Sequence, residues 1–394
     1  MRCAECKGRL LCGLPACPVM IRFHAQLRLR PAREYAGTSP SVFLGSRGYP
    51  AVRGGPLLVD DSDLPTDWIS RGLTLDQIVG IRAGTIRGMA PAGRQGDALR
   101  EIALSSRPLG VEVAFERVPR FDLAFDGTVA PVGLTGEIRR MEVLGNPVVE
   151  RPVEKATSDT DLGAGDACAL LHRDGVDVYR IARLFTAGLL GRRRRMVPTR
   201  WAITAVDDSV FRGLHRALST APSLETALLH EATLYGNRIL VLLAPGPWRF
   251  EMVEVWGRHS LWGGEEDYVV VDGERGKKKG YSPITGAYYS ARLAVAEHLV
   301  RTGRTGTVLV VRAVSSDYWA PLGTWVVREV TRQALRGPPE EFLSFSAALP
   351  HLATRLGGYR WLERSALIPE MRSQRRLSDY ETGEESLINP GADP

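Results

Sequence analysis

The hydrophobic pattern has a period of two between residues 111 and 144 and helical spacing after residue 156. The alternation of short apolar and polar positions in the first stretch is typical of half-buried strands. Helical spacing later in the chain indicates helices at 176–190, 209–218, 287–300 and 322–335. Apolar runs between them predict strands at 238–244, 249–256, 268–272 and 306–314. This succession predicts an α/β or mixed α+β fold, in which helices pack on a mixed sheet.

The length of 394 residues exceeds what one hydrophobic core usually supports, about 250–300 residues. Composition divides the chain into a cysteine module at 1–20, a β-rich region at 21–150, an α/β main domain at 151–370 and a flexible tail at 371–394. The β-rich region also contains a short helix pattern at 75–81, where the Thr74 hydroxyl can accept an N–H of the first turn. We assign the tail as flexible because it is too polar to bury enough apolar area to become ordered.

The composition is that of an ordinary globular protein, with 44% hydrophobic and 24% charged residues. No apolar run approaches the roughly 20 residues that span a bilayer, so no membrane partner is expected. The N-terminus has no apolar signal-peptide core, and a cytoplasmic location is therefore expected.

Four of the five cysteines lie close to the N-terminus, with the spacing Cys-x2-Cys-x5-Cys-x4-Cys over Cys3, Cys6, Cys12 and Cys17. This clustering favours an intracellular metal site over a disulfide scaffold. Four thiolates match the tetrahedral preference of Zn²⁺, while an iron–sulfur cluster and a set of redox-active or incidental thiols are alternatives. A segment this short has no core, so metal binding would have to supply its folding free energy.

A short motif in the tail pairs one polar residue with two apolar ones at i+3 and i+6, namely Gln374, Leu377 and Tyr380. In a tight helical turn the two apolar side chains fall on one side and form a plug, with Gln374 at its edge. The motif resembles the peptides that dock on the sliding clamp of DNA replication, PCNA. Such peptides often carry a second aromatic residue, and here that position is Glu381, which predicts weaker binding.

All but five of the 51 basic residues are arginine, and the formal net charge is +6. Arginine binds phosphate in a bidentate manner, so DNA is an allowed partner. Two basic runs are candidate phosphate-binding segments: Arg192, Arg193, Arg194 and Arg195, and Lys277, Lys278 and Lys279. The alternative is that Arg192–Arg195 are a solvated surface that pairs with a helix C-terminus, and that Lys277–Lys279 are simply a solvated loop.

Acidic pairs are weaker evidence for a functional site than the cysteines or the basic runs. Asp207 and Asp208 have the residue types for Mg²⁺ binding or acid–base catalysis, but they are equally natural caps for a helix that begins near Ser209. No phosphate-binding Gly-x4-Gly-Lys-(Ser/Thr) loop is present, so nothing indicates an ATPase. The best candidates for a catalytic role are Arg200, Asp207, Asp208, Tyr288 and Tyr289.

Four stretches of the sequence, at 7–18, 37–50, 197–208 and 318–329, are similar to the archaeal Nre DNA repair proteins, and the similarity covers nearly the whole chain. The resemblance implies a role in the response to DNA damage. It also implies a zinc-finger-like N-terminus on the four clustered cysteines and a clamp-binding peptide on Gln374, Leu377 and Tyr380. It implies no catalytic residue.

Three hypotheses follow: a DNA repair factor recruited through PCNA, an enzyme that modifies DNA or nucleotides, and an adaptor without chemistry. A concave pocket that combines Arg200 with Asp207 or Asp208 would favour the enzyme. A flat basic face without such a pocket would favour the DNA-binding factor.

Overall fold

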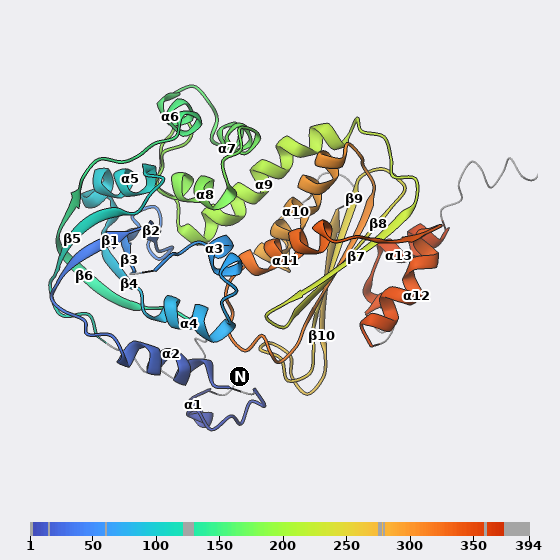
Figure 1. Ribbon diagram of the computed structural model, residues 1–394, viewed down its shortest axis with the longest axis horizontal. Helices are drawn as coiled ribbons and strands as arrows, with labels where there is room; N and C mark the ends of the chain where they lie inside the picture. The colour runs from blue at the N-terminus through green and yellow to red at the C-terminus, as the bar shows by residue number, and fades with distance from the viewer. Residues whose placement is uncertain are drawn as a thin grey trace, which may run out of the picture.

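The protein is arranged in two lobes, each built around a six-stranded mixed sheet, as Figure 1 shows. The computed structural model describes residues 3–14, 16–59, 61–120, 130–274, 278, 280–357 and 361–373. Residues 121–125 within the alternating stretch, the tail motif, Lys277 and Lys279 lie outside these ranges. The fold class predicted from the sequence, mixed α+β with helices packed on mixed sheets, is confirmed.

The first lobe contains a sheet with the strand order β1-β5-β6-β4-β3-β2. Its strands are β1 (Glu34–Ser39), β2 (Ser41–Leu44), β3 (Arg53–Leu58), β4 (Ile86–Pro91), β5 (Leu109–Phe115) and β6 (Leu134–Leu144). Only β4 and β6 pair in parallel among these strands; the other neighbours are antiparallel. Alternate residues of β5 are buried, as the period of two predicts, and Val111, Val113 and Phe115 point into the core.

Helices cover the buried face of this sheet. They are α5 (Gly96–Leu104), preceded by the 3₁₀ turn η1 (Ala92–Gln95), and α6 (Arg151–Ser158), α7 (Ala164–Arg173) and α8 (Val178–Thr186). Leu99 of α5, Leu171 of α7 and Ile181 of α8 join the same apolar core as the strands. The helices that follow residue 150 therefore pack on the first sheet.

Three further helices lie on the side that faces the second lobe or the N-terminus: α2 (Pro18–Leu27), α3 (Pro65–Ser70) and α4 (Leu75–Ala83). The predicted cap of α4 is confirmed, because the Thr74 hydroxyl accepts from the Gln77 N–H and the Gln77 side chain accepts from the Thr74 N–H. A four-residue helix, α1 (Cys3–Cys6), begins the described chain.

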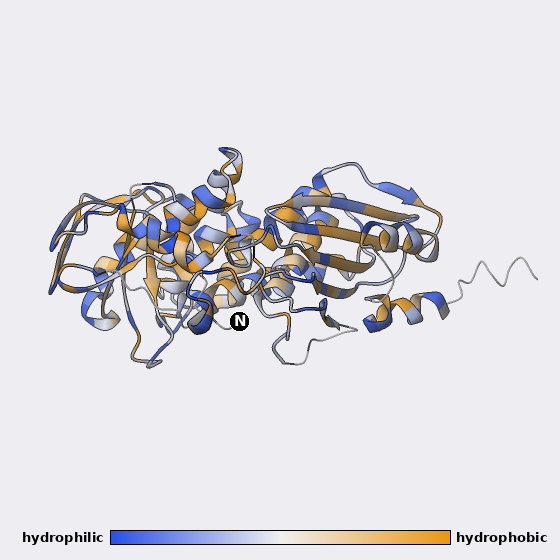
Figure 2. Cartoon of the chain, turned by 90° about the horizontal axis from the view of Figure 1, so that it is seen from below, coloured by the Kyte–Doolittle hydropathy of each residue, from blue (hydrophilic) through white to orange (hydrophobic). Residues whose placement is uncertain are grey.

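The second lobe is a three-layer sandwich around the strand order β10-β9-β11-β8-β7-β12. Its strands are β7 (Ala227–Leu234), β8 (Asn237–Ala244), β9 (Arg249–Trp256), β10 (Tyr268–Glu274), β11 (Thr307–Val314) and β12 (Glu340–Phe342). The helices are α10 (Gly286–Thr302), α11 (Trp325–Arg336), α12 (Phe345–Arg355), the 3₁₀ turn η2 (Leu362–Arg364) and α13 (Leu367–Ser373). The central strands are apolar on both faces, which Figure 2 shows as continuous orange arrows.

The helix α9 (Thr199–Leu218) connects the lobes, and its start corrects the sequence prediction. The sequence pattern predicts a helix only from Ser209, with Asp207 or Asp208 as its cap. Instead α9 begins ten residues earlier, after Pro198, so both aspartates lie inside the helix. The first turns do carry apolar residues, such as Ala202 and Val206, which are buried, but the two consecutive aspartates and Ser209 locally indicate a helix start.

The segment around 176–190 also differs from its prediction. Here α8 begins at Val178 and ends at Thr186 instead of Leu190, and Gly191 lies beyond its end with a φ of 84°. None of the helices in the described ranges is both long and apolar enough to cross a bilayer.

Candidate nucleic-acid interface

In the described part of the cysteine module, the chain turns around the sulfur atom of Cys6. Cys6 is only 7% exposed, and its Sγ accepts the Leu11 N–H at 3.2 Å. Burial raises the pKa of the Cys6 thiol, but N–H groups of Leu11, Gly8, Arg9 and Cys12 lower it by more, so the net shift is downward. The environment of this sulfur therefore suits a thiolate, the form that binds metal.

The side chain of Cys3 lies outside the described part of the chain. Cys12 and Cys17 are half-buried and free of disulfides. Among the described side chains, no group of three His, Cys, Asp or Glu residues converges closely enough to hold a metal ion. The four-cysteine zinc site remains a prediction.

Two of the catalytic candidates from the sequence are fully buried: Asp207 on α9, and Tyr288 on α10, where its ring meets Phe250 of β9. Asp207 is 1% exposed, accepts two hydrogen bonds from Arg328 Nη2 at 2.5 and 2.6 Å, and accepts the Ser290 hydroxyl at 2.8 Å. Desolvation by burial strongly raises the pKa of the Tyr288 hydroxyl, so this group stays neutral. Neither side chain is therefore accessible to a substrate from solvent.

Asp208 and Tyr289 surround Arg292, a buried arginine that the sequence analysis did not single out. Arg292 donates to Asp208 at 2.5 Å and to Glu274 at 2.7 Å. Its guanidinium lies 3.8 Å from the ring centroid of Phe211 and 5.2 Å from that of Tyr289. The two carboxylates and the two aromatic rings thus stabilise the charge of the buried Arg292 guanidinium.

Arg200, the fifth catalytic candidate, does not join this cluster. It lies in the first turn of α9, two turns before Asp207, and is exposed. The ion pairs given for Asp207 and Asp208 are with other arginines, so the described structure does not bring Arg200 together with them. Asp207 and Asp208 thus belong to separate ion pairs, Tyr288 and Tyr289 lie beside Arg292, and Arg200 belongs to a surface.

The predicted basic runs have different surroundings. Arg192 Nε donates to the Asp161 carbonyl at 2.6 Å and Arg194 Nη2 to the Asp159 carbonyl at 2.9 Å, while Arg193 and Arg195 are exposed. Lys278 forms an ion pair with Asp272 and lies 4.8 Å from the ring centroid of Tyr288. Arg193 and Arg195 are therefore available to a ligand, whereas Lys278 is engaged within the protein.

The segment with these arginines leads directly into α9, where exposed arginines and aromatics meet. The Leu44 N–H donates to Thr199 Oγ1 at 2.9 Å and joins β2 to the start of α9. Next to this contact, the exposed rings of Tyr49 and Trp201 lie 5.1 Å apart. We call the exposed residues of this region the α9 surface: Arg47, Tyr49, Arg94, Arg193, Arg195, Arg200 and Trp201.

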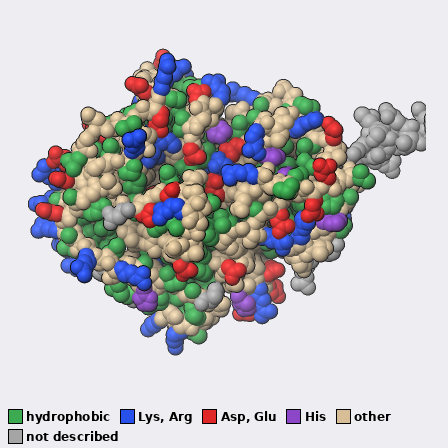
Figure 3. All heavy atoms as spheres, in the orientation of Figure 1, with side chains coloured by type: hydrophobic (Ala, Val, Ile, Leu, Met, Phe, Trp, Pro, Cys, Tyr) green, Lys and Arg blue, Asp and Glu red, His purple; other side chains and the backbone are tan. Residues whose placement is uncertain are grey.

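Further contacts tie the segments of the α9 surface together. The Ala92 N–H, in the turn that carries Arg94, donates to the Val52 carbonyl at 3.0 Å, and Met196 lies beside Gly96 at the start of α5. Elsewhere, on the rim of the first lobe at the left of Figure 3, basic and acidic side chains are interspersed. Sequence reasoning missed Tyr49 and Trp201, although both fall in stretches that carry the family resemblance.

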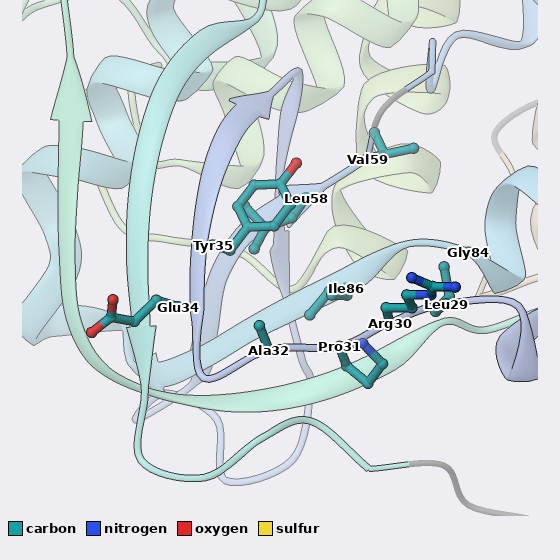
Figure 4. Close-up of a pocket in the computed structure, with 10 residues that line it drawn as sticks. All are labelled: Leu29, Arg30, Pro31, Ala32, Glu34, Tyr35, Leu58, Val59, Gly84 and Ile86. Atoms are coloured by element: carbon teal, nitrogen blue, oxygen red, sulfur yellow. The ribbon is translucent and has the colours of Figure 1, made fainter.

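A separate shallow pocket of about 180 Å³ lies at the edge of the first sheet (Figure 4). It is lined by the connection between α2 and β1 and by the ends of β3 and α4, with Tyr35 and Leu58 on one wall and Arg30 and Glu34 at its rim. None of the residues singled out from the sequence lines it.

Comparisons with known proteins give a consistent family assignment. The model of the N-terminal region of archaeal Nre matches residues 11–263, and that of the C-terminal region matches residues 273–380. The chain is 33% identical over 377 residues to the DNA repair protein NreA of Archaeoglobus fulgidus, with 92% of this chain and 95% of the relative covered.

Two further relatives are similar over most of their length. The DNA repair protein NreB of Archaeoglobus fulgidus is 33% identical, with 96% of this chain and 100% of the relative covered. The DNA repair protein NreA of Haloferax volcanii is 35% identical, with 80% and 81% covered. No solved structure matches the chain. From the extent of these matches, the chain belongs to the archaeal Nre family.

Proposed function

We propose that this protein is a cytoplasmic DNA repair factor that contacts DNA through the α9 surface and is recruited to DNA by the sliding clamp PCNA. The relatives that match nearly the whole chain are named DNA repair proteins. The observation that carries the DNA contact is the group of exposed arginines around the first turn of α9. Exposed arginine binds phosphate in a bidentate manner and releases counterions from DNA.

The α9 surface accounts for DNA binding without base-specific contacts. Each neutralised phosphate steepens the dependence of log affinity on log salt by about 0.9 for a duplex and about 0.7 for a single strand. The triple variant Arg193→Ala/Arg195→Ala/Arg200→Ala is therefore expected to flatten that slope by about 2–3. A labelled DNA oligonucleotide, titrated between low and moderate salt and followed by fluorescence anisotropy, measures this.

The matched control removes the same charge from other exposed arginines, at Arg216, Arg301 and Arg364. This control triple should keep most of the slope, because these residues lie away from the α9 surface. Equal slopes in the two triple variants would show that DNA does not use the α9 surface.

The tail peptide supplies the second half of the proposal. Leu377 and Tyr380 would plug into the clamp, and the tether would raise the effective concentration of the lobes near the encircled DNA. The variant Leu377→Ala/Tyr380→Ala is expected to abolish co-purification with PCNA and to leave the melting temperature unchanged. Undiminished co-purification of this variant would refute the assignment, and Leu387→Ala, farther along the tail, is the control.

The cysteine module completes the proposal with a structural Zn²⁺ held by Cys3, Cys6, Cys12 and Cys17. The support is the sulfur of Cys6, whose N–H donors favour the thiolate form. A bound Zn²⁺ would cross-link a segment that has no core of its own. The folded module would then hold its own Leu14 in the apolar core of the second lobe, where Leu14 is 3% exposed.

A further inference from the structure

Tyr49 and Trp201 are exposed aromatic residues that touch each other on the α9 surface. Their side chains are 44% and 43% exposed, and their ring planes meet at 63°. Large aromatics are usually buried, as Trp68, Tyr288 and Tyr318 are in this protein. Paired exposed rings therefore call for a functional explanation.

The backbone beneath both rings is held in place by hydrogen bonds. The Trp201 N–H donates to the Pro198 carbonyl at 2.8 Å in the first turn of α9, and the Leu44 N–H anchors Thr199 at 2.9 Å. On the other side, the Gly45 N–H donates to the Arg53 carbonyl and the Val52 N–H to the Pro50 carbonyl, both at 2.9 Å. The two rings thus project from an ordered surface, which lowers the entropic cost of binding.

The charge around the rings is positive. Arg47 and Arg200 are neighbours of Tyr49 and Trp201 in the chain, and both are exposed. Arg53 is paired with the exposed Glu137. The N-terminus of α9 has no side-chain cap, and the dipole of this 20-residue helix adds to the attraction for an anion.

We propose that Tyr49 and Trp201 form a stacking platform for an unpaired base of single-stranded DNA, with the flanking phosphates held by Arg47, Arg200 and the N-terminus of α9. The inference deepens the proposed function, and it rests on the proposed contact between DNA and the α9 surface. The ligand is single-stranded because a base inside a duplex has both faces covered by its neighbours. An unpaired base can stack on an aromatic ring whatever its identity, and arginine then binds the backbone.

The test compares single-stranded and duplex oligonucleotides of equal length, with fluorescence anisotropy at one fixed salt concentration. The variants are Trp201→Ala and Tyr49→Ala, and each is expected to weaken single-strand binding by about 5- to 150-fold. Duplex binding should change less than twofold, because the arginines remain. Trp201→Phe, which keeps an aromatic face, should retain most of the single-strand affinity.

The matched controls are Trp262→Ala and Tyr281→Ala, which remove exposed aromatics at 54% and 63% exposure from the other lobe. The ring of Trp262 also touches a second aromatic, Trp256, with centroids 4.4 Å apart, so it mimics the geometry of Trp201. Both controls should bind single strands like the unmodified protein. A melting curve of each variant verifies that the fold is retained.

The outcomes separate this inference from the proposed function. If Trp201→Ala and Tyr49→Ala bind single strands as tightly as the two controls, the stacking platform is wrong. Should the arginine triple variant still flatten the salt slope in that case, DNA contact through the α9 surface stands without stacking. Failure of the unmodified protein to bind any DNA would overturn both proposals.

Discussion

Arg328 of α11 donates from one nitrogen to both carboxylate oxygens of Asp207 in α9, at 2.5 and 2.6 Å, inside a core where neither side chain is more than 2% exposed. The pair joins the helix that connects the lobes to a helix of the second lobe. Ser290 of α10 donates to the same carboxylate, so three helices meet at one buried charge. The role of Asp207 is therefore to fix the packing of α9.

Removal of one partner of this pair should destabilise the protein strongly. Arg328→Met leaves Asp207 as a buried, uncompensated carboxylate, which is expected to cost about 3–5 kcal/mol of unfolding free energy. Urea unfolding measures the loss. The double variant Asp207→Leu/Arg328→Met should recover much of it, since no isolated charge remains, and a loss below about 1 kcal/mol in the single variant would contradict the structural role.

A second network, around Glu297 of α10, predicts loss of stability in acid. Burial raises the pKa of the Glu297 carboxyl, but His172 and Arg332, at 3.0 and 2.8 Å, lower it by more, to about 2. Because the folded protein holds this group ionised, its contribution is complete above about pH 4.3 and is lost as the pH falls toward 2.

The variant Glu297→Gln isolates this contribution. It should lower the unfolding free energy by about 2–3 kcal/mol at pH 7, and the difference from the unmodified protein should shrink between about pH 4.3 and pH 2. Unfolding in urea at neutral pH and in mild acid measures both values. A difference that does not depend on pH would mean that the ionisation of Glu297 is not involved.

Asp63, between β3 and α3, has the opposite pH dependence. Desolvation raises the pKa of the Asp63 carboxyl to about 6, although the charges of Arg82 and Arg183 act to lower it. The folded protein then binds more protons than the unfolded chain between about pH 4 and pH 6, so stability falls as the pH rises through this window. Asp63→Asn should be more stable than the unmodified protein by about 1–3 kcal/mol at about pH 8 and equal to it near pH 4.

The metal proposal predicts one Zn²⁺ per chain in protein purified without chelator. Cys6→Ser should lose the metal, because a serine hydroxyl does not supply the thiolate ligand. Cys168→Ser is the control: Cys168 is fully buried in the first lobe, and burial raises the pKa of its thiol to about 12. Native mass spectrometry of both variants gives the metal content, and metal-free unmodified protein with full stability would refute the site.

The central strands of the second lobe, β8, β9 and β11, could be predicted from the sequence because they are short, continuous apolar runs. The strands β7 and β12 and the helix α12 were not predicted. The Thr74 cap of α4 was also predictable, because it depends on two residues only three positions apart, Thr74 and Gln77. The partners of Asp207 could not be predicted, because Arg328 lies 121 residues away along the chain. Local pattern also favoured Asp207 as a helix cap, and tertiary burial overrode it.

The α9 surface was predicted only in part for a similar reason. Arg193 and Arg195 stand out as a run, whereas Tyr49 and Trp201 are single aromatics that come together through the contact between β2 and α9. The buried ion pairs of Arg292 could likewise not be predicted, because its partners Asp208 and Glu274 come from α9 and β10. Long-range pairs of this kind require the fold.

Cell survival after DNA damage tests the repair role most directly. The gene is deleted from its host, and survival is measured after exposure to a DNA-damaging agent, with complementation by the unmodified protein, the Arg193→Ala/Arg195→Ala/Arg200→Ala variant or the Leu377→Ala/Tyr380→Ala variant. We predict that the deletion strain is sensitive, that the unmodified protein restores survival and that neither variant does so fully. A deletion strain as resistant as its parent would contradict the account.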